Sequence, residues 1–289
     1  MALDGIVTKN IIKELNTTIL GGKIDKIYQP EKDEIIINIY NKGNTYKLLV
    51  SANSSNPRIH LTRYSKQNPA TPPMFCMLLR KHLVGGIIQN IEQFQIDRVI
   101  FIDISSMDEL GNMVIKRLII EIMGKHSNII LIDKASSKII DSIKRVTSAM
   151  SRVREVLPGV SYILPKQDDK KNPLRTNKEE FLDLLSKEDK SKKIYKFFYE
   201  KYMGLSPIIS KEICYLANID IDSPIGALSE KDGEKLFNVF SEIINKIKKE
   251  EFKPTLIKKE YGQQYRAFYC LDIQQFGSNN KIYMESINQ

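Results

Sequence analysis

The chain has 289 residues, of which 42% are hydrophobic and 27% are charged, and its formal net charge is +9. These values are those of a globular protein with about two domains and real hydrophobic cores. No run approaches the roughly 18 uninterrupted apolar residues of a membrane span, and Asp4 stands where a signal peptide would carry positive charge. We therefore expect a cytoplasmic protein. The positive charge favours a polyanionic partner, either nucleic acid or an anionic membrane surface, although basic chains are also common in Lys-rich proteomes.

Cysteines and histidines are few and scattered along the chain. Their spacing gives neither a disulfide framework nor a Cys-x-x-Cys metal pair. We expect no metal site and no cofactor. The residues concerned are Cys76, Cys214, Cys270, His60, His82 and His126.

The N-terminal part begins with one helix and continues mainly as strands. Asp4 is placed to cap a helix that runs to about Leu15. Alternating apolar residues and turn residues then predict strands over residues 23–28, 34–40 and 45–51. Further strands are expected over residues 97–104, 114–123, 128–133 and 138–143.

A proline-rich loop precedes a predicted helix over residues 74–84, which stops at Gly85-Gly86. Arg80 and Lys81 fall in its last turns. They suit the negative end of the helix dipole, and they are equally candidates for contacts with RNA phosphates.

The segment Gly124 to Asn128 lies between two apolar strands and reads as a short polar loop. Lys125, His126, Ser127 and Asn128 can each donate hydrogen bonds to a phosphate or a base edge. A plain polar hairpin turn is the alternative. A nucleotide-binding P-loop is excluded, because that motif needs glycine where the chain has Ile119 and Ser or Thr where it has His126.

Residues 142–154 carry four basic side chains and no acid: Lys144, Arg145, Arg152 and Arg154. A solvated surface would more often interleave Asp or Glu. We interpret this segment as a basic patch that neutralises phosphates.

A charged linker flanked by Pro165 and Pro173 separates this part from a helical segment over residues 177–252. Within it, Met203-Gly204-Leu205 closes one helix and Ser206-Pro207 opens the next. That pattern indicates a helix-hairpin-helix, whose backbone N–H groups near Gly204 can hold a phosphate. An ordinary pair of packed helices is the alternative.

The expected fold class is α+β: a mostly antiparallel β domain at the N-terminus, followed by an all-α helix-hairpin-helix domain. We expect an α+β domain over residues 1–172 and a helical domain over residues 173–252. Residues 253–289 should return as strands that pack on the first domain.

Seven segments, taken in order, resemble the N-terminal part of the NFACT family. The resemblance covers essentially the whole chain. The segments are Met1-Ala2-Leu3-Asp4-Gly5, Lys26-Ile27-Tyr28-Gln29-Pro30, Pro57-Arg58-Ile59-His60-Leu61-Thr62, residues 73–83, Asp97-Arg98, residues 121–128 and Arg154-Glu155-Val156-Leu157-Pro158-Gly159.

The resemblance implies a first domain like the N-terminal fold of formamidopyrimidine-DNA glycosylases. It also implies a ribosome-associated quality-control factor rather than an enzyme. Such a factor binds tRNA, alanine-accepting in bacteria, and large ribosomal subunits obstructed by peptidyl-tRNA, and it directs template-free alanine tailing of the stalled chain. It has no membrane partner. Full-length members continue into a coiled coil and an RNA-binding domain, which we expect beyond residue 289.

The family's functional positions map onto Asp4, Asp97 and Arg98. Neighbouring side chains in a regular strand face opposite ways, so Asp97 and Arg98 share a site only if the strand bulges or ends there. Otherwise one of them is structural. Arg98 is the better candidate for RNA contact, because its planar fork pairs with phosphate or guanine. Asp4 is equally explained as a helix cap.

Two other functions compete with tRNA binding. The older name of the bacterial members, fibronectin-binding protein A, suggests a surface adhesin with fibronectin as partner. A DNA glycosylase would need an N-terminal proline nucleophile and an adjacent glutamate, but the chain has Ala2 and Leu3.

Overall fold

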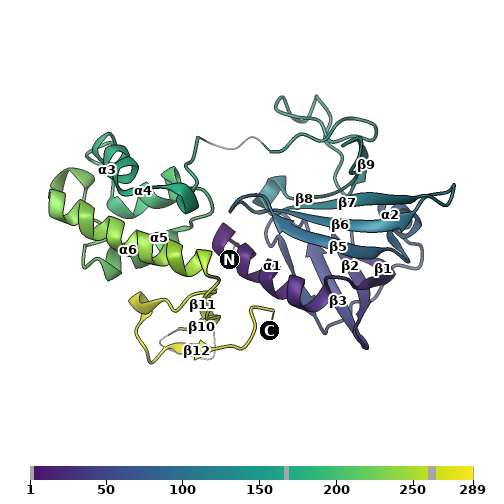
Figure 1. Cartoon of the computed structure of the whole chain (residues 1–289), viewed down its shortest axis with the longest axis horizontal. Helices are drawn as coiled ribbons and strands as arrows, with labels where there is room; N and C mark the ends of the chain where they lie inside the picture. Colours follow the sequence, from purple (N-terminus) through teal and green to yellow (C-terminus); the bar gives the residue numbers. More distant parts are fainter. Residues whose placement is uncertain (1–2, 166–168, 260–264, 289) are drawn as a thin grey trace.

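The computed structural model describes residues 3–165, 169–259 and 265–288. Its N-terminal part combines two helices with one large antiparallel sheet (Figure 1). The elements are α1 (Gly5–Ile19), β1 (Lys23–Glu31), β2 (Glu34–Asn41), β3 (Asn44–Ser51), β4 (Arg58–Thr62), α2 (Met74–Leu83), β5 (Ile87–Gln93), β6 (Val99–Met107), β7 (Met113–Glu121), β8 (Asn128–Asp133) and β9 (Ile139–Ser142).

Within residues 3–165, nine strands are hydrogen-bonded in the order β4-β3-β2-β1-β5-β6-β7-β8-β9. Strands β1 and β5 share a single register pair, Lys23 opposite Ile87, with a few more backbone hydrogen bonds beside it, so the sheet has two halves joined over a short stretch. Helix α1 packs on strands of both halves and buries Ile6, Leu15 and Ile19 completely. The N-terminus of α1 thereby lies beside the strands that carry the predicted site.

Four helices build the segment after the linker: α3 (Lys178–Ser186), α4 (Ile194–Lys201), α5 (Pro207–Leu216) and α6 (Glu230–Lys248). Asn177 and Ser229 start α3 and α6 with capping boxes. The core between the helices is aromatic. The rings of Phe181 and Tyr202 stack with their centres 6.2 Å apart, and the ring centres of Tyr202 and Phe240 are 4.9 Å apart.

The C-terminal strands, among described residues, form a separate sheet in the order β11-β10-β12. They are β10 (Thr255–Lys258), β11 (Tyr265–Tyr269) and β12 (Lys281–Tyr283). The segment touches both earlier parts. Glu14 of α1 accepts hydrogen bonds from Ser286 and from the amide of Ile287, and Glu212 of α5 accepts from the amides of Gln274 and Gln275.

The predicted α+β class with a mostly antiparallel sheet is confirmed, and the domain boundaries at residues 172 and 252 stay a prediction. Strands β4 and β5 were not predicted. β4 has five residues and β5 mixes apolar and polar side chains, so neither gives a clear periodic signal. Strand β6 begins at Val99, two residues later than expected.

The helical segment joins the first part through two glycines in close contact. The amide of Gly5 donates to the carbonyl of Gly204 at 3.0 Å. A Cβ on Gly204, whose φ is +76°, would lie 2.2 Å from the carbonyl oxygen of Ile96. Only glycine fits this position, because any side chain would push the two backbones apart.

We expect Gly204→Ala to destabilise the chain far more than Gly21→Ala. Gly21 has nearly the same φ, +77°, with nothing within 4 Å of its Cβ position, so its substitution measures backbone strain alone. That strain costs about 1–2 kcal/mol, and the clash at Gly204 adds roughly 1–3 kcal/mol. Urea unfolding of both variants checks this. Equal losses would contradict the close contact.

Candidate functional site

A cleft of about 450 Å³ lies where the large sheet meets the α4–α5 hairpin. It brings together residues from five separate stretches of the chain. Five predicted site residues line it: Asp4, Asp97, Arg98, His126 and Gly204.

Asp97 and Arg98 sit in the turn that precedes β6. The amide of Asp97 donates to the carbonyl of Phe94 at 2.9 Å, and the Asp97 carboxylate accepts the amide of Arg98 at 2.7 Å. Because β6 begins after them, strand alternation does not force their side chains apart, and both line the cleft. No carboxylate among the described residues pairs with the Arg98 guanidinium, so its charge is available to a ligand.

The hairpin presents the positive end of α5 to the same cleft. Gly204 turns the chain in the left-handed region, and Pro207 occupies the first turn of the helix. Ser206 stands at the N-cap, but its hydroxyl donates to Asp4 and does not cap α5. The first N–H groups of α5 therefore lack a side-chain cap, which suits an anion.

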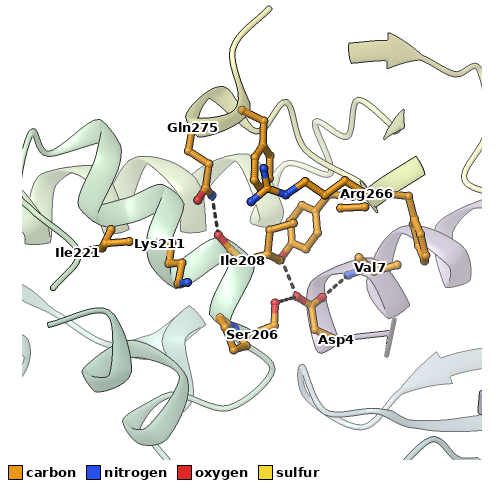
Figure 2. A pocket seen from close by; sticks show the side chains of 13 residues that line it. Asp4, Val7, Ser206, Ile208, Lys211, Ile221, Arg266 and Gln275 are labelled. Carbon is orange, nitrogen blue, oxygen red and sulfur yellow. Dashed lines mark hydrogen bonds between the residues drawn. The ribbon is translucent and has the colours of Figure 1, made fainter. Parts of the chain in front are cut away.

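Asp4 is buried beneath this junction and holds three segments together (Figure 2). Its Oδ1 accepts the amides of Ile6 and Val7, and its Oδ2 accepts the hydroxyls of Ser206 and Tyr269. Burial raises the pKa of Asp4, although these hydrogen bonds act in the opposite direction. Asp4 is thus the helix cap that the sequence suggested, and it also fixes the position of Ser206.

The loop after β7 exposes fewer donors than the sequence suggested. Lys125 and His126 are exposed on a short 3₁₀ turn, and His126 reaches the cleft. Ser127 and Asn128 are buried. The Ser127 hydroxyl accepts the amide of Met123, and the Asn128 amide group donates to the carbonyl of Lys144. The expectation of four donors at the tip is corrected to two, because Ser127 bonds the backbone of the loop and Asn128 bonds the backbone of Lys144.

The basic patch is partly neutralised by acids that lie outside residues 142–154. Arg145 makes a two-point contact with Asp141, one residue before the segment. Arg154 pairs with Glu121, which is fully buried, and the hydroxyl of Tyr162 donates to the same carboxylate. Lys144 donates to the carbonyl of Ala52. Arg152 alone of the four has an exposed side chain without a partner among the described residues.

Arg80 and Lys81 are not among the cleft residues, and α2 lies at the end of the sheet remote from the helical segment (Figure 1). Arg80 donates to the carbonyl of Ile27 at 2.8 Å, and Lys81 pairs with Glu109.

Two cleft residues escaped the sequence analysis, Lys170 and Tyr199. Lys170 donates to the carbonyl of Tyr199 at 3.0 Å. The sequence signal for Lys170 was the run of charged residues in the linker, which we interpreted as a solvent-exposed connection between the two parts.

In the described ranges no cluster of His, Cys, Asp or Glu is arranged to hold a metal ion. None of the described helices combines the length and the apolar character needed to cross a bilayer.

Comparison with known protein families identifies the family of this chain. Residues 4–289 match the family described as NFACT N-terminal and middle domains. The chain belongs to the NFACT family, and the prediction made from its seven motifs is confirmed.

A curated relative is the "Rqc2 homolog RqcH" of Bacillus subtilis, 43% identical over 219 residues, which are 76% of this chain and 38% of that protein. The chain thus spans about two-fifths of this relative's length. Among solved structures, the fibrinogen binding protein from Staphylococcus aureus superposes with a TM-score of 0.83 at 32% identity, covering 100% of this chain and 97% of that one. The N-terminal part of the fibronectin/fibrinogen-binding protein from Streptococcus suis gives 0.79 at 32% identity, covering 99% and 96%.

We expect Arg154→Ala to destabilise the chain by about 3–5 kcal/mol, because it leaves the buried Glu121 carboxylate without its cation. Arg152→Ala, at an exposed position in the same segment, is the matched control and should change stability by less than about 0.5 kcal/mol. Chemical unfolding measures both. Similar small effects would show that the Arg154 pair is not structural.

The raised pKa of Asp4 predicts a pH dependence of defined sign. A carboxyl with a raised folded-state pKa contributes stability that is complete below its usual value of 3.8 and is lost as the pH rises through the folded pKa. The free energy of unfolding of the wild type, relative to Asp4→Asn, should therefore fall as the pH rises above 3.8.

Asp133 is the control with the opposite sign, because Lys116 lowers its pKa to about 2. Its contribution is present above 3.8 and disappears as the pH falls toward 2. Urea titrations from about pH 2 to 7 should show that the stability of the wild type relative to Asp4→Asn and its stability relative to Asp133→Asn change in opposite directions with pH. Parallel slopes would contradict the raised pKa of Asp4.

Proposed function

We propose that the chain binds tRNA in the cleft between the large sheet and the α4–α5 hairpin. The observation that carries this proposal is the convergence of Arg98, His126 and the uncapped start of α5 in one cavity. An arginine fork, an imidazole and backbone N–H groups are donors suited to phosphates and base edges.

The groups in the cleft have distinct roles in this proposal. Arg98 contacts a phosphate or guanine, and the amides at the start of α5 hold a second phosphate, as in a helix-hairpin-helix. Asp97 shapes the turn that presents Arg98, since its carboxylate accepts the Arg98 amide. Lys125 and Arg152, whose side chains are exposed, are outer phosphate contacts, whereas Arg145 is held by Asp141.

We further propose that the chain is the N-terminal part of a cytoplasmic ribosome-associated quality-control factor. Relatives named as Rqc2 homologs support this proposal. The factor would engage the obstructed large ribosomal subunit with its peptidyl-tRNA and direct template-free alanine tailing of the stalled chain. In this mechanism the protein positions tRNA, and the ribosome's own centre makes the peptide bond, so no catalytic residue is assigned to this chain.

Removing the Arg98 fork should weaken tRNA binding without unfolding the chain. We expect Arg98→Ala to lose about 5- to 150-fold in affinity, the range for one two-point arginine contact, and to reduce the salt slope by about 1. The measurement is a titration of labelled alanine tRNA across salt, with a non-cognate tRNA for comparison. Lys187→Ala, at the C-cap of α3 where the lysine side chain is 71% exposed, is the charge-matched control.

The double variant Asp97→Ala/Arg98→Ala tests whether this turn reads the tRNA. Selective binding that disappears in the variant supports the proposal. Equal, salt-sensitive binding of every tRNA by both proteins would mean that the cleft supplies only charge. If the variant were destabilised enough to account for its loss of tRNA binding, Arg98 would be a structural residue.

Adhesion to fibronectin is the second candidate, favoured by the similar solved structures of a fibrinogen binding protein and a fibronectin/fibrinogen-binding protein. A basic protein also binds many acidic ligands through charge alone. Fibronectin binding that survives high salt would favour this function. Binding that collapses between about 50 and 200 mM salt would reflect general electrostatics.

A further inference from the structure

The first turn of α5 separates the cleft from a second pocket, which has a volume of about 590 Å³. Asp4, Ser206 and Pro207 line both cavities. Helices α1 and α5 and the C-terminal segment enclose the second pocket (Figure 2). Its volume lies within the roughly 300–1,000 Å³ range of small-molecule sites.

The walls of this pocket are mainly apolar and aromatic, and they include Val7, Ile208, Phe268 and Phe276. The polar groups at its inner end are already bonded to one another. Tyr269 donates to Asp4 at 2.7 Å. These groups keep the pocket in shape and leave its apolar surface to a ligand.

Two cationic side chains also line the pocket, Lys211 from α5 and Arg266 from β11 (Figure 2). Neither has an ion-pair partner among the described residues. The Arg266 guanidinium lies 4.7 Å from the centre of the Phe276 ring, and the Lys211 ammonium lies 4.9 Å from that of Tyr195. A cation–π contact leaves the charge of each cation in place. Asp222, which pairs with Lys193, is the carboxylate that interacts with the charge of Lys211.

An apolar cavity with aromatic walls and two unpaired cations matches a ligand that has a flat ring and an anionic group. A single unstacked nucleotide has both, since its base stacks on aromatic side chains and on arginine planes while its phosphate seeks positive charge. Lys211 and Arg266 would repel the positively charged side chains of a peptide. The acyl chain of a fatty acid has no flat ring to stack on the aromatic walls.

We propose that the second pocket binds one unpaired nucleotide, with its base against Phe268 and Phe276 and its phosphate beside Lys211 and Arg266. The source of this nucleotide rests on the proposed function: it is a residue of the same RNA whose neighbouring phosphates lie in the cleft across the first turn of α5.

The pocket is tested with free nucleoside 5′-monophosphates, titrated into the whole chain and followed by NMR. We expect saturable binding that weakens at least about fivefold in Phe276→Leu, which keeps an apolar side chain but loses the stacking face. Lys211→Gln/Arg266→Gln should weaken it further. Lys187→Gln/Lys190→Gln removes two exposed charges just after α3 and should bind like the wild type. Thermal melting verifies that each variant is folded.

A second arm uses intact tRNA and chemical probing of its bases. We expect one unpaired base to be protected in the wild-type complex and to become reactive with Lys211→Gln/Arg266→Gln. Protection that is unchanged in this variant would overturn the proposal, as would a wild-type chain that binds no monophosphate.

The two proposals fail separately. If monophosphates bind the pocket while Arg98→Ala leaves tRNA binding intact, tRNA recognition in the cleft is wrong and the pocket is a site for free nucleotides. If Arg98→Ala abolishes tRNA binding while the pocket variants change neither binding nor protection, the cleft proposal stands and the nucleotide pocket is wrong.

Discussion

The buried carboxylate of Asp4 is the interaction on which the arrangement of the molecule depends. It caps α1 and accepts the hydroxyls of Ser206 and Tyr269, so one side chain joins the sheet domain, the helical hairpin and the C-terminal strands. Desolvation opposes the charge, and burial raises the pKa of this group. The carboxylate is tolerated there because each of its oxygens accepts two hydrogen bonds.

This junction determines the geometry of the cleft as well as its stability. Arg98 belongs to the sheet, and the positive end of α5 belongs to the hairpin. Their separation is therefore set by the contacts between the two parts. The Gly5–Gly204 backbone contact brings the parts together, and the Asp4–Ser206 bond fixes the rotation of α5 beside them. A ligand that bridges both sides meets a site that is already formed, which reduces the ordering cost of binding.

The sequence predicted the elements whose signals are local and missed what depends on distant partners. Long strands, α1 and the Gly204 turn follow from periodicity, capping and glycine, so their existence could be read directly. Short β4 gave no such signal. Arg154 looked like a free cation because its partner, the buried Glu121, lies 33 residues away in the chain. Ser127 was read as an exposed donor, since a loop sequence does not show which of its side chains bond its own backbone.

The net charge of +9 overstates the charge available to an RNA partner, because several cations are paired with carboxylates within the fold. Arg117 is held by Asp103 and Glu92, and Arg154 by Glu121, so these cations are committed to the fold. The salt dependence of RNA binding counts only phosphates that are neutralised at the interface. Cations available for that purpose include Arg98 in the cleft and Lys211 and Arg266 in the second pocket, on either side of the first turn of α5. Affinity for RNA then depends on a few positioned charges, and substitutions among the paired arginines change stability instead.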